Sequence, residues 1–249
     1  MRAPADGVVL DTAQAAAAGA GLKCMMPIGG RPFLDYVLHA LADAGIDDVA
    51  LVLSPVQDEP RDYYRRLRTT RIGIQFVTQA EPRGTADAVL SGEQWAGAAS
   101  FLVLNSDNLY PRHVLDALVA ARGPAMPGFE RDSLGLPLER LGSFALIEPD
   151  DRQCLSRIVE KPGVEVMRAA GPAALVSMNV WRFDAAIFDA CRDVPVSARG
   201  ERELPEAAGL AARTTCIEVV PVRGEVLDLS TRADVAAVDA ALAGTQVLL

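Results

Sequence analysis

The sequence predicts an α/β protein with a doubly wound, mostly parallel, Rossmann-like sheet and a small antiparallel hairpin in a substrate-binding lobe. Two patterns point to this class. From residue 32 to residue 121, short apolar runs alternate with segments of helical periodicity, and this β-α-β order is typical of parallel sheets. After residue 141, two apolar runs flank a short polar turn, which indicates an antiparallel hairpin.

The first 121 residues supply the parallel part of this plan. Val49–Leu53 and Phe101–Leu104 are short apolar runs typical of buried strands, and Ile72–Val77 alternates like a strand. Gly45 indicates the end of the first of these helices, and Thr85 is suited to cap the third. We expect helices at residues 32–44, 59–68, 85–95 and 111–121.

The character of the sequence changes after residue 122. Residues 122–140 hold three prolines and three glycines, which favour a long loop. Ser143–Ile147 and Cys154–Val159 are the two arms of the expected hairpin. We expect further strands at residues 174–183, 216–221 and 225–229, and further helices at residues 184–192, 201–212 and 232–242.

Length and charge limit the possible functions. The 249 residues, 50% hydrophobic and 23% charged, suit a single domain, with a nucleotide-binding half at 1–121 and a substrate half at 122–249. The net charge of −9, with no basic stripe, argues against nucleic acid as a partner. No apolar run reaches the roughly 18 residues of a membrane span, so we expect no membrane association.

Four cysteines are widely spaced, at positions 24, 154, 191 and 216. None forms a CxxC pair, which argues against zinc and against a disulfide framework. We therefore expect four free thiols and a cytoplasmic protein.

Three polar clusters follow predicted strands, where open α/β sheets bind their ligands. Asn105–Asn108 follows one strand, and a carboxylate such as Asp107 can hold Mg²⁺ between phosphates, although these residue types also favour plain turns. Gln79–Ala86 forms a loop in which Gly84 would let a flat base approach the backbone. Glu160–Pro162 could hold a phosphate and a sugar hydroxyl, or be a surface ion pair.

Taken in order, these pieces resemble the sugar-1-phosphate nucleotidyltransferase family, which makes nucleoside-diphosphate sugars. Any one piece is weakly specific, whereas the ordered set is specific. The matching segments are Lys23 with Met26–Leu34, Gln79–Ala88, Leu104–Asp107, Ile158–Pro162, Ser177–Asn179, Arg199–Glu201 with Glu203–Leu204, and Leu227–Thr231.

The resemblance implies a glycosyltransferase-A-like fold and a role for each matching position. A sugar-1-phosphate oxygen would attack the α-phosphate of a nucleoside triphosphate, with UTP or dTTP and glucose-1-phosphate favoured, and pyrophosphate would leave. Mg²⁺ would be the cofactor, and the protein could form a homo-oligomer. The catalytic residues would be Lys23, Asp107 and Lys161, and the metal ligands would be Asp107 and Asp228. The nucleotide would be bound by Lys23, Gln79, Gly84, Thr85 and Asp107. The sugar phosphate would be bound by Gly142, Glu160, Lys161 and Asn179.

One family motif is absent as written: an opening strand followed by a Gly-rich loop that ends in arginine. In one explanation, Val8–Leu10 is a short first strand and Asp11–Gly21 replaces the loop. Against it, Asp11 and Gln14 form a capping-box pattern ahead of four alanines, which predicts a helix at residues 12–18. In the preferred explanation, the strand and the loop lie upstream of Met1 and residues 3–22 are an insertion.

The missing motif leaves a second function open. A chain without the phosphate loop would turn over weakly or not at all, so the alternative is a sensor that binds nucleotides or nucleotide sugars. The presence of both Asp107 and Asp228 favours the enzyme, because a sensor has no need for two metal carboxylates.

Overall fold

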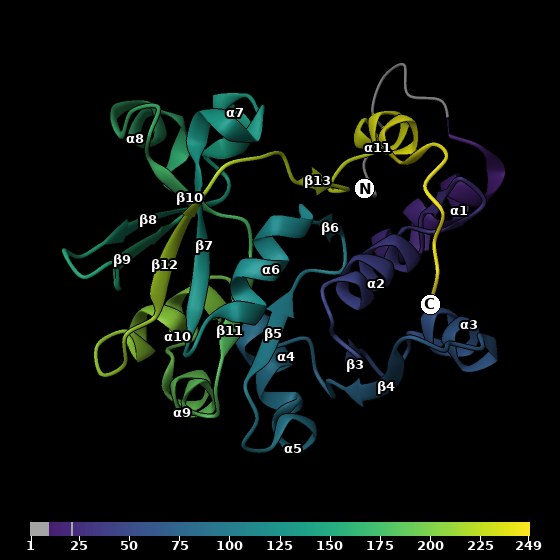
Figure 1. Ribbon diagram of the computed structural model, residues 1–249, viewed down its shortest axis with the longest axis horizontal. Helices are drawn as coiled ribbons and strands as arrows, with labels where there is room; N and C mark the ends of the chain where they lie inside the picture. The colour runs from purple at the N-terminus through teal and green to yellow at the C-terminus, as the bar shows by residue number, and fades with distance from the viewer. Residues whose placement is uncertain (1–9, 21) are drawn as a thin grey trace.

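The computed structural model describes residues 10–20 and 22–249 and has the expected α/β architecture (Figure 1). The first strands along the chain are β1 (Pro27–Ile28), β2 (Arg31–Pro32), β3 (Asp48–Leu53), β4 (Gly73–Thr78), β5 (Phe101–Leu104) and β6 (Asn108–Leu109). The later strands are β7 (Ala125–Glu130), β8 (Ala145–Pro149), β9 (Leu155–Glu160), β10 (Leu175–Ser177), β11 (Val180–Phe183), β12 (Glu218–Val222) and β13 (Leu227–Asp228).

Helices flank these strands. Those of the first half are α1 (Thr12–Ala20), the 3₁₀ turn η1 (Lys23–Met25), α2 (Phe33–Asp43), α3 (Asp58–Arg66), α4 (Thr85–Ser91), α5 (Glu93–Ala96) and α6 (Arg112–Ala120). Those of the second half are the 3₁₀ turn η2 (Arg131–Leu134), α7 (Leu138–Leu141), α8 (Gly163–Ala169), α9 (Ala186–Asp193), α10 (Leu204–Ala211) and α11 (Asp234–Leu242). In the described part of the chain, no helix has the length and apolar character needed to cross a bilayer.

The main sheet has seven strands in the order β5-β11-β7-β10-β8-β9, with β12 also paired to β7. The expectation of a mostly parallel sheet is wrong here, because β7–β12 is its one parallel pair among the described strands. Strands β8 and β9 form a hairpin, and two strands joined by a tight turn pair antiparallel. The parallel expectation holds for β3 and β4, which form a separate two-stranded sheet.

The predicted loop at residues 122–140 is wrong, since it contains β7, the strand at the centre of the main sheet. Pro124, Pro127 and Gly128 hid this strand, because proline and glycine are normally depleted from central strands. Packing explains the glycine: a Cβ at Gly128 would lie 3.0 Å from side-chain atoms of Leu175 and Val219. Tertiary contact therefore overrides local propensity at β7.

Two other expected elements are interrupted. The helix expected at residues 85–95 is split into α4 and α5 at Gly92. The strand expected at residues 174–183 is split into β10 and β11 at Asn179, whose φ is +57°. This break matters for the sheet, because β10 pairs with β8 whereas β11 pairs with β5.

The N-terminal helix forms as the capping pattern predicts. The Gln14 amide donates to Asp11 Oδ1 at 2.7 Å, and the Asp11 amide donates to Gln14 Oε1 at 3.2 Å. The proposed short strand Val8–Leu10 lies almost entirely outside the described residues. Within the described residues, no strand precedes Pro27.

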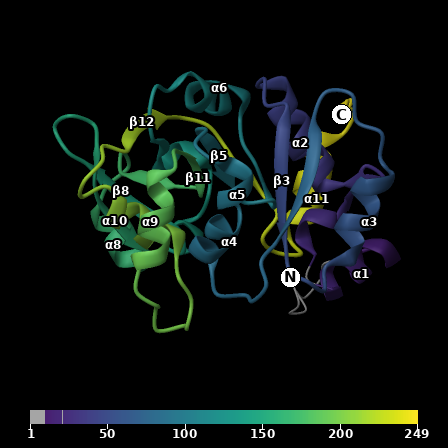
Figure 2. The ribbon, with the colours of Figure 1, turned by 90° about the horizontal axis from the view of Figure 1, so that it is seen from below.

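Helices cover both faces of the main sheet. Helix α6 lies on one face, and α4, α9 and α10 lie on the other (Figure 2). Trp181 and Phe183 of β11 are fully buried on the second of these faces, together with Phe188 of α9. Burial of such aromatic side chains stabilises the fold by about 1.5–3 kcal/mol each.

The prediction of four free thiols is wrong for two of them. Cys154 and Cys216 form a disulfide, while Cys24 and Cys191 remain free. The bond joins the start of β9 to the segment before β12, which are already close through a bridge between Cys154 and Glu218. The 62-residue separation hid the pairing, because proximity here comes from the sheet and not from the sequence.

We expect Cys154→Ser to lower the free energy of unfolding by about 2–4 kcal/mol, because the disulfide no longer restricts the unfolded chain. Urea denaturation without reductant measures this difference. With dithiothreitol present, the wild-type and variant curves should move towards each other. Equal stabilities without reductant would show that the disulfide does not form in solution.

Candidate active site

Lys23 and Asp107 meet in the folded protein. Lys23 lies in η1, directly after α1, and its Nζ is 3.1 Å from Asp107 Oδ2. Asp107 lies in the short turn between β5 and β6, where the Asn108 amide donates to the Asn105 carbonyl. The Asn-Ser-Asp segment is therefore both the turn that its residue types favour and a carrier of a site carboxylate. Both side chains are partly exposed, so solvent and ligands can reach them.

Asp228 is brought beside Asp107 by the pairing of β13 with β6. Asp228 is opposite Asn108 in this ladder, and the Leu229 amide donates to the Asp107 carbonyl at 2.9 Å. The Asp228 carboxylate is buried and both of its oxygens are hydrogen-bonded. Its Oδ1 accepts from Ser230 Oγ at 2.5 Å.

The other partner of Asp228 is Arg140 of α7, which no sequence motif indicated. Arg140 Nη2 donates to Asp228 Oδ2 at 2.8 Å, while Nη1 donates to Asp234 Oδ1 at 2.6 Å. Burial acts to raise the pKa of Asp234, but hydrogen bonds from Arg140 and from the Thr231 amide outweigh it, and the pKa is lowered. Arg140 thus joins α7 to β13 and α11 through charge-assisted hydrogen bonds.

Asp107 and Asp228 fit Mg²⁺ by the chemistry of their donor set. Asp107 lies in the turn just before β6 and Asp228 lies in β13, which pairs with β6, and Mg²⁺ is commonly held by one or two carboxylates together with substrate phosphates. Over residues 10–20 and 22–249, no three His, Cys, Asp or Glu side chains cluster to hold a metal. Magnesium binding stays a prediction.

The loop after β4 places Gln79 in a fixed orientation. Its Nε2 donates to the Gly84 carbonyl at 3.0 Å and to Asp87 Oδ2 at 2.9 Å. Both partners are acceptors only, so the amide nitrogen must face them. The side-chain oxygen Oε1 is then the atom of Gln79 left to bind another group.

The same loop is tied to the chain before α10. The Arg202 amide donates to the Arg83 carbonyl at 2.7 Å, and the Ala86 amide donates to the Arg202 carbonyl at 2.9 Å. The Leu204 amide donates to Thr85 Oγ1 at 2.9 Å, so this hydroxyl has a structural role besides its predicted contact with nucleotide. Gly84 is required here because its φ is +105° and a Cβ would lie 2.4 Å from the Arg202 carbonyl oxygen.

The residues predicted to bind the sugar phosphate form two groups, of which the first surrounds the end of β9. The Gly163 amide donates to the Gly142 carbonyl, and a Cβ at Gly142 would lie 2.8 Å from Gly163 backbone. Burial, the largest effect, raises the pKa of Glu160; Lys161 opposes this shift and Glu203 adds to it. Lys161 Nζ lies 3.8 Å from Glu160 Oε1, and its side chain is about half exposed.

The second site predicted to bind the sugar phosphate is Asn179, which lies at the break between β10 and β11. Tyr110 stabilises the backbone at this break, because its hydroxyl donates to the Met178 carbonyl oxygen at 2.7 Å and lies 3.3 Å from the Asn179 carbonyl oxygen. Among the described residues, Gln153, Lys161 and Asn179 are the non-glycine residues with positive φ. Two of these three are predicted ligand residues, and left-handed backbone at non-glycine positions is concentrated at functional sites.

Helices connect these groups. Helix α10 contacts both α4, which follows the Gln79 loop, and β9, which ends at Glu160. Helix α7 carries Arg140 and is followed directly by Gly142. The structure thus joins Lys23, Asp107 and Asp228 directly, and links the Gln79 and Glu160 groups through shared helices.

The sequence missed Asp87, Tyr110 and Arg140, which hold predicted site residues in place. Arg140 lies within the stretch interpreted as a loop, where Leu138–Leu141 is one helical turn. Asp87 lies in the first turn of α4, on the same helix that Thr85 begins. Their partners are distant or require the folded loop, so local patterns carry little signal for them.

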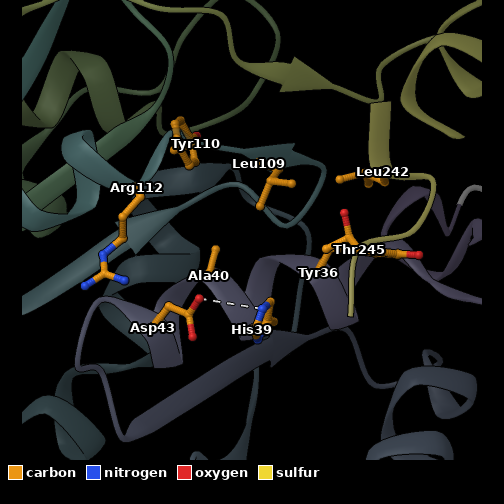
Figure 3. Close-up of a pocket in the computed structure, with 9 residues that line it drawn as sticks. All are labelled: Tyr36, His39, Ala40, Asp43, Leu109, Tyr110, Arg112, Leu242 and Thr245. Carbon is orange, nitrogen blue, oxygen red and sulfur yellow. Dashed lines mark ion pairs between the residues drawn. The ribbon is translucent and has the colours of Figure 1, made fainter. Parts of the chain in front are cut away.

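A cavity of about 180 Å³ lies between α2, the β6–α6 connection and the C-terminal segment, and Tyr110 is part of its lining (Figure 3). His39 and Asp43 of α2 face Leu109 and Thr245 across it, and His39 Nε2 lies 3.6 Å from Asp43 Oδ2. None of the predicted ligand residues lines this cavity.

Comparison with known proteins identifies similar sequences and a similar fold. The family described as "Nucleotidyl transferase" matches residues 20–215. A putative UTP–glucose-1-phosphate uridylyltransferase of Methanocaldococcus jannaschii is 24% identical, covering 83% of this chain and 80% of that protein. A glucose-1-phosphate thymidylyltransferase of Streptomyces griseus is 28% identical, covering 78% of this chain and 54% of that protein.

A solved structure shares the fold. The crystal structure of a UDP-glucose pyrophosphorylase complexed with UDP-glucose superposes with a TM-score of 0.74 at 18% identity, covering 90% of this chain and 91% of that one. This likeness confirms the predicted fold class.

We expect Gly84→Ala to destabilise the protein by more than roughly 1–3 kcal/mol, because it adds a clash with Arg202 to the strain of a positive φ. Gly171→Ala is the matched control, since Gly171 also has positive φ (+85°) but has open space around a Cβ. Chemical denaturation compares the two variants. Equal losses would show that the Gly84 contact with Arg202 does not constrain the loop.

Proposed function

This chain belongs to the nucleotidyl transferase family, and we propose that it transfers a nucleotidyl group from a nucleoside triphosphate to a sugar-1-phosphate. The observation that carries the proposal is the joining of Lys23, Asp107 and Asp228 across β6 and β13. The proteins of similar sequence named above act on glucose-1-phosphate, which supports the same substrate class here.

The reaction needs positioning and charge compensation more than proton transfer. An oxygen of the sugar phosphate attacks the α-phosphorus, the bond from that phosphorus to the β-phosphate bridging oxygen breaks, and pyrophosphate leaves. The attacking phosphate is already anionic at neutral pH, so no general base is required. Lys23 would contact the nucleotide phosphates and Lys161 the sugar phosphate, which brings two polyanions together.

Asp107 and Asp228 would hold Mg²⁺, which when bound neutralises phosphate charge as the leaving oxygen becomes more negative. Lys23 is already within ion-pair distance of Asp107, so binding of phosphates would transfer the lysine from the carboxylate to the nucleotide. Glu160 and Asn179 would orient the sugar phosphate, with Gly142 giving close access to the backbone.

The orientation of Gln79 supports uracil or thymine as the base. Because its Nε2 is used by Gly84 and Asp87, Gln79 can only accept a hydrogen bond through Oε1. The N3–H of uracil or thymine is a donor, whereas N3 of cytosine is an acceptor. We therefore propose UTP or dTTP as the nucleotide. The names of the similar proteins support glucose-1-phosphate as the proposed sugar substrate.

Location and assembly stay predictions. We propose a cytoplasmic enzyme, consistent with the supply of nucleoside triphosphates, and the Cys154–Cys216 disulfide is the observation that argues against that compartment. The possible homo-oligomer and the division of the domain near residue 121 are likewise predictions. Strand β5 from the first half pairs with β11 from the second, so the main sheet crosses that division.

A second function is favoured by α1. Its residues lie where a phosphate loop would precede Lys23, and amides inside a helix are paired and cannot bind phosphate. A protein that binds nucleotide or nucleotide sugar without turnover is the alternative. Pyrophosphate release, measured with a panel of nucleotides and sugar-1-phosphates, distinguishes the two: binding without release supports the sensor.

We expect Asp107→Asn to lower kcat by at least about a hundredfold, because it removes a carboxylate proposed to hold Mg²⁺ at the reacting phosphates. Its stability should change little, since the pair with Lys23 is partly exposed. Coupled pyrophosphate assays and thermal unfolding measure these effects. Asp151→Asn, at an exposed turn, is the control. Wild-type rates in Asp107→Asn would refute the assignment.

We expect Gln79→Ala to lower kcat/KM for UTP by about tenfold to a hundredfold and to reduce the preference for UTP over CTP, because the acceptor for N3–H is lost. Gln75→Ala is the matched control, since Gln75 lies on the preceding strand β4 and contacts Asp48 at the surface. An unchanged UTP-to-CTP ratio in Gln79→Ala would contradict the base assignment.

A further inference from the structure

Each of the two carboxylates proposed to bind a cation already forms an ion pair with a positively charged side chain of the protein. Lys23 contacts Asp107, and Arg140 contacts Asp228. A divalent cation must therefore compete with an internal cation at both positions. The two contacts differ in how easily they can be given up.

The Lys23 contact is the more exposed. The Lys23 side chain is 33% exposed and that of Asp107 is 20% exposed, and one Nζ···Oδ2 contact of 3.1 Å joins them. Lysine has rotatable donors on a flexible stem, so solvent or phosphate can take its place at low cost.

The Arg140 contact is more buried and more constrained. Asp228 has a side chain that is 3% exposed, and the guanidinium reaches both its carboxylate and its carbonyl oxygen. The guanidinium also forms a two-point contact with Asp234, through Nη1 to Oδ1 at 2.6 Å and Nη2 to Oδ2 at 3.0 Å. Asp234 therefore anchors Arg140 through both terminal nitrogens, whereas Asp228 is contacted through Nη2 alone.

We propose that Arg140 is an internal counter-ion of Asp228 that keeps a divalent cation off this carboxylate until nucleotide arrives. This inference rests on the proposed function, because it takes Asp228 as the cation-binding carboxylate. Arg140 is a positioning residue: it acts through Asp228 and not on the substrate.

The anchor on Asp234 makes the exchange feasible. When triphosphate adds negative charge beside Asp107 and Asp228, Arg140 can release the Asp228 oxygen and keep its two bonds to Asp234. No buried charge is left unpaired, which would otherwise be strongly unfavourable. Cation binding at Asp228 is thereby coupled to nucleotide binding.

The test measures the affinity of the intact protein for Mn²⁺ without nucleotide. The electron paramagnetic resonance signal of free Mn²⁺ reports how much of the ion is unbound. We expect Arg140→Met to bind Mn²⁺ at least about tenfold more tightly than wild type, because a positive charge next to the site is lost. Arg140→Lys, which keeps the charge, should stay within about twofold of wild type. A non-hydrolysable UTP analogue should reduce the difference between Arg140→Met and wild type.

Control variants separate the possible outcomes. Arg168→Met removes an exposed arginine of α8 that pairs with Glu165, and should leave Mn²⁺ affinity unchanged. With the non-hydrolysable UTP analogue present, Asp228→Asn should weaken Mn²⁺ binding; an unchanged affinity under that condition would refute the cation assignment and the proposed function at this residue. If Asp228→Asn weakens binding but Arg140→Met does not strengthen it, the inference about Arg140 alone is wrong. Should Arg140→Met fail to fold by circular dichroism, Arg140→Gln takes the same test.

Discussion

The ladder between β6 and β13 is short, and the whole candidate site depends on it. It places Asp228 opposite Asn108 and joins Leu229 to Asp107 by a backbone hydrogen bond, so two distant carboxylates become neighbours. Two residue pairs alone would hold such a contact weakly. Arg140 reinforces it from a third element, because its guanidinium binds Asp228 at the end of β13 and Asp234 at the start of α11. The charged residues proposed to act in this region therefore also hold the C-terminal segment in place.

In the rest of the candidate site, too, the backbone is held by hydrogen bonds from residues in other segments of the chain. The Gln79 loop is held by amide and hydroxyl contacts with residues 202–204, and Gly84 is the residue that lets the two segments approach. Lys161 and Asn179 adopt left-handed backbone, and Tyr110 supports the break at Asn179 through the Met178 carbonyl. Such positions are individually unfavourable and persist only when surrounding contacts specify them. The residues predicted to bind the sugar phosphate thus lie on backbone whose conformation is set by the fold.

Much of the fold was predictable because local signals agreed with the tertiary outcome. Apolar periodicity placed β3, β4 and β5, and the Asp11–Gln14 capping pair placed the start of α1. The failures share a cause, which is contact between residues far apart in the chain. Strand β7 contains proline and glycine and is nevertheless central, because β12, β10 and β11 supply its partners. The Cys154–Cys216 bond arose from sheet neighbours 62 residues apart, where spacing in the sequence gives no information.

The sequence by itself determined the family, the α/β class and the residue types of the site, because ordered motifs and hydrophobic periodicity are written along the chain. It named Lys23, Asp107 and Asp228 and the Gln79–Ala88 loop as the chemical groups. Only the tertiary structure decided the direction of the main strands, the orientation of the Gln79 amide and the pairing of Arg140 with two carboxylates. These depend on which side chains meet in space, and hydrogen-bond geometry between distant segments is fixed only when the chain has folded.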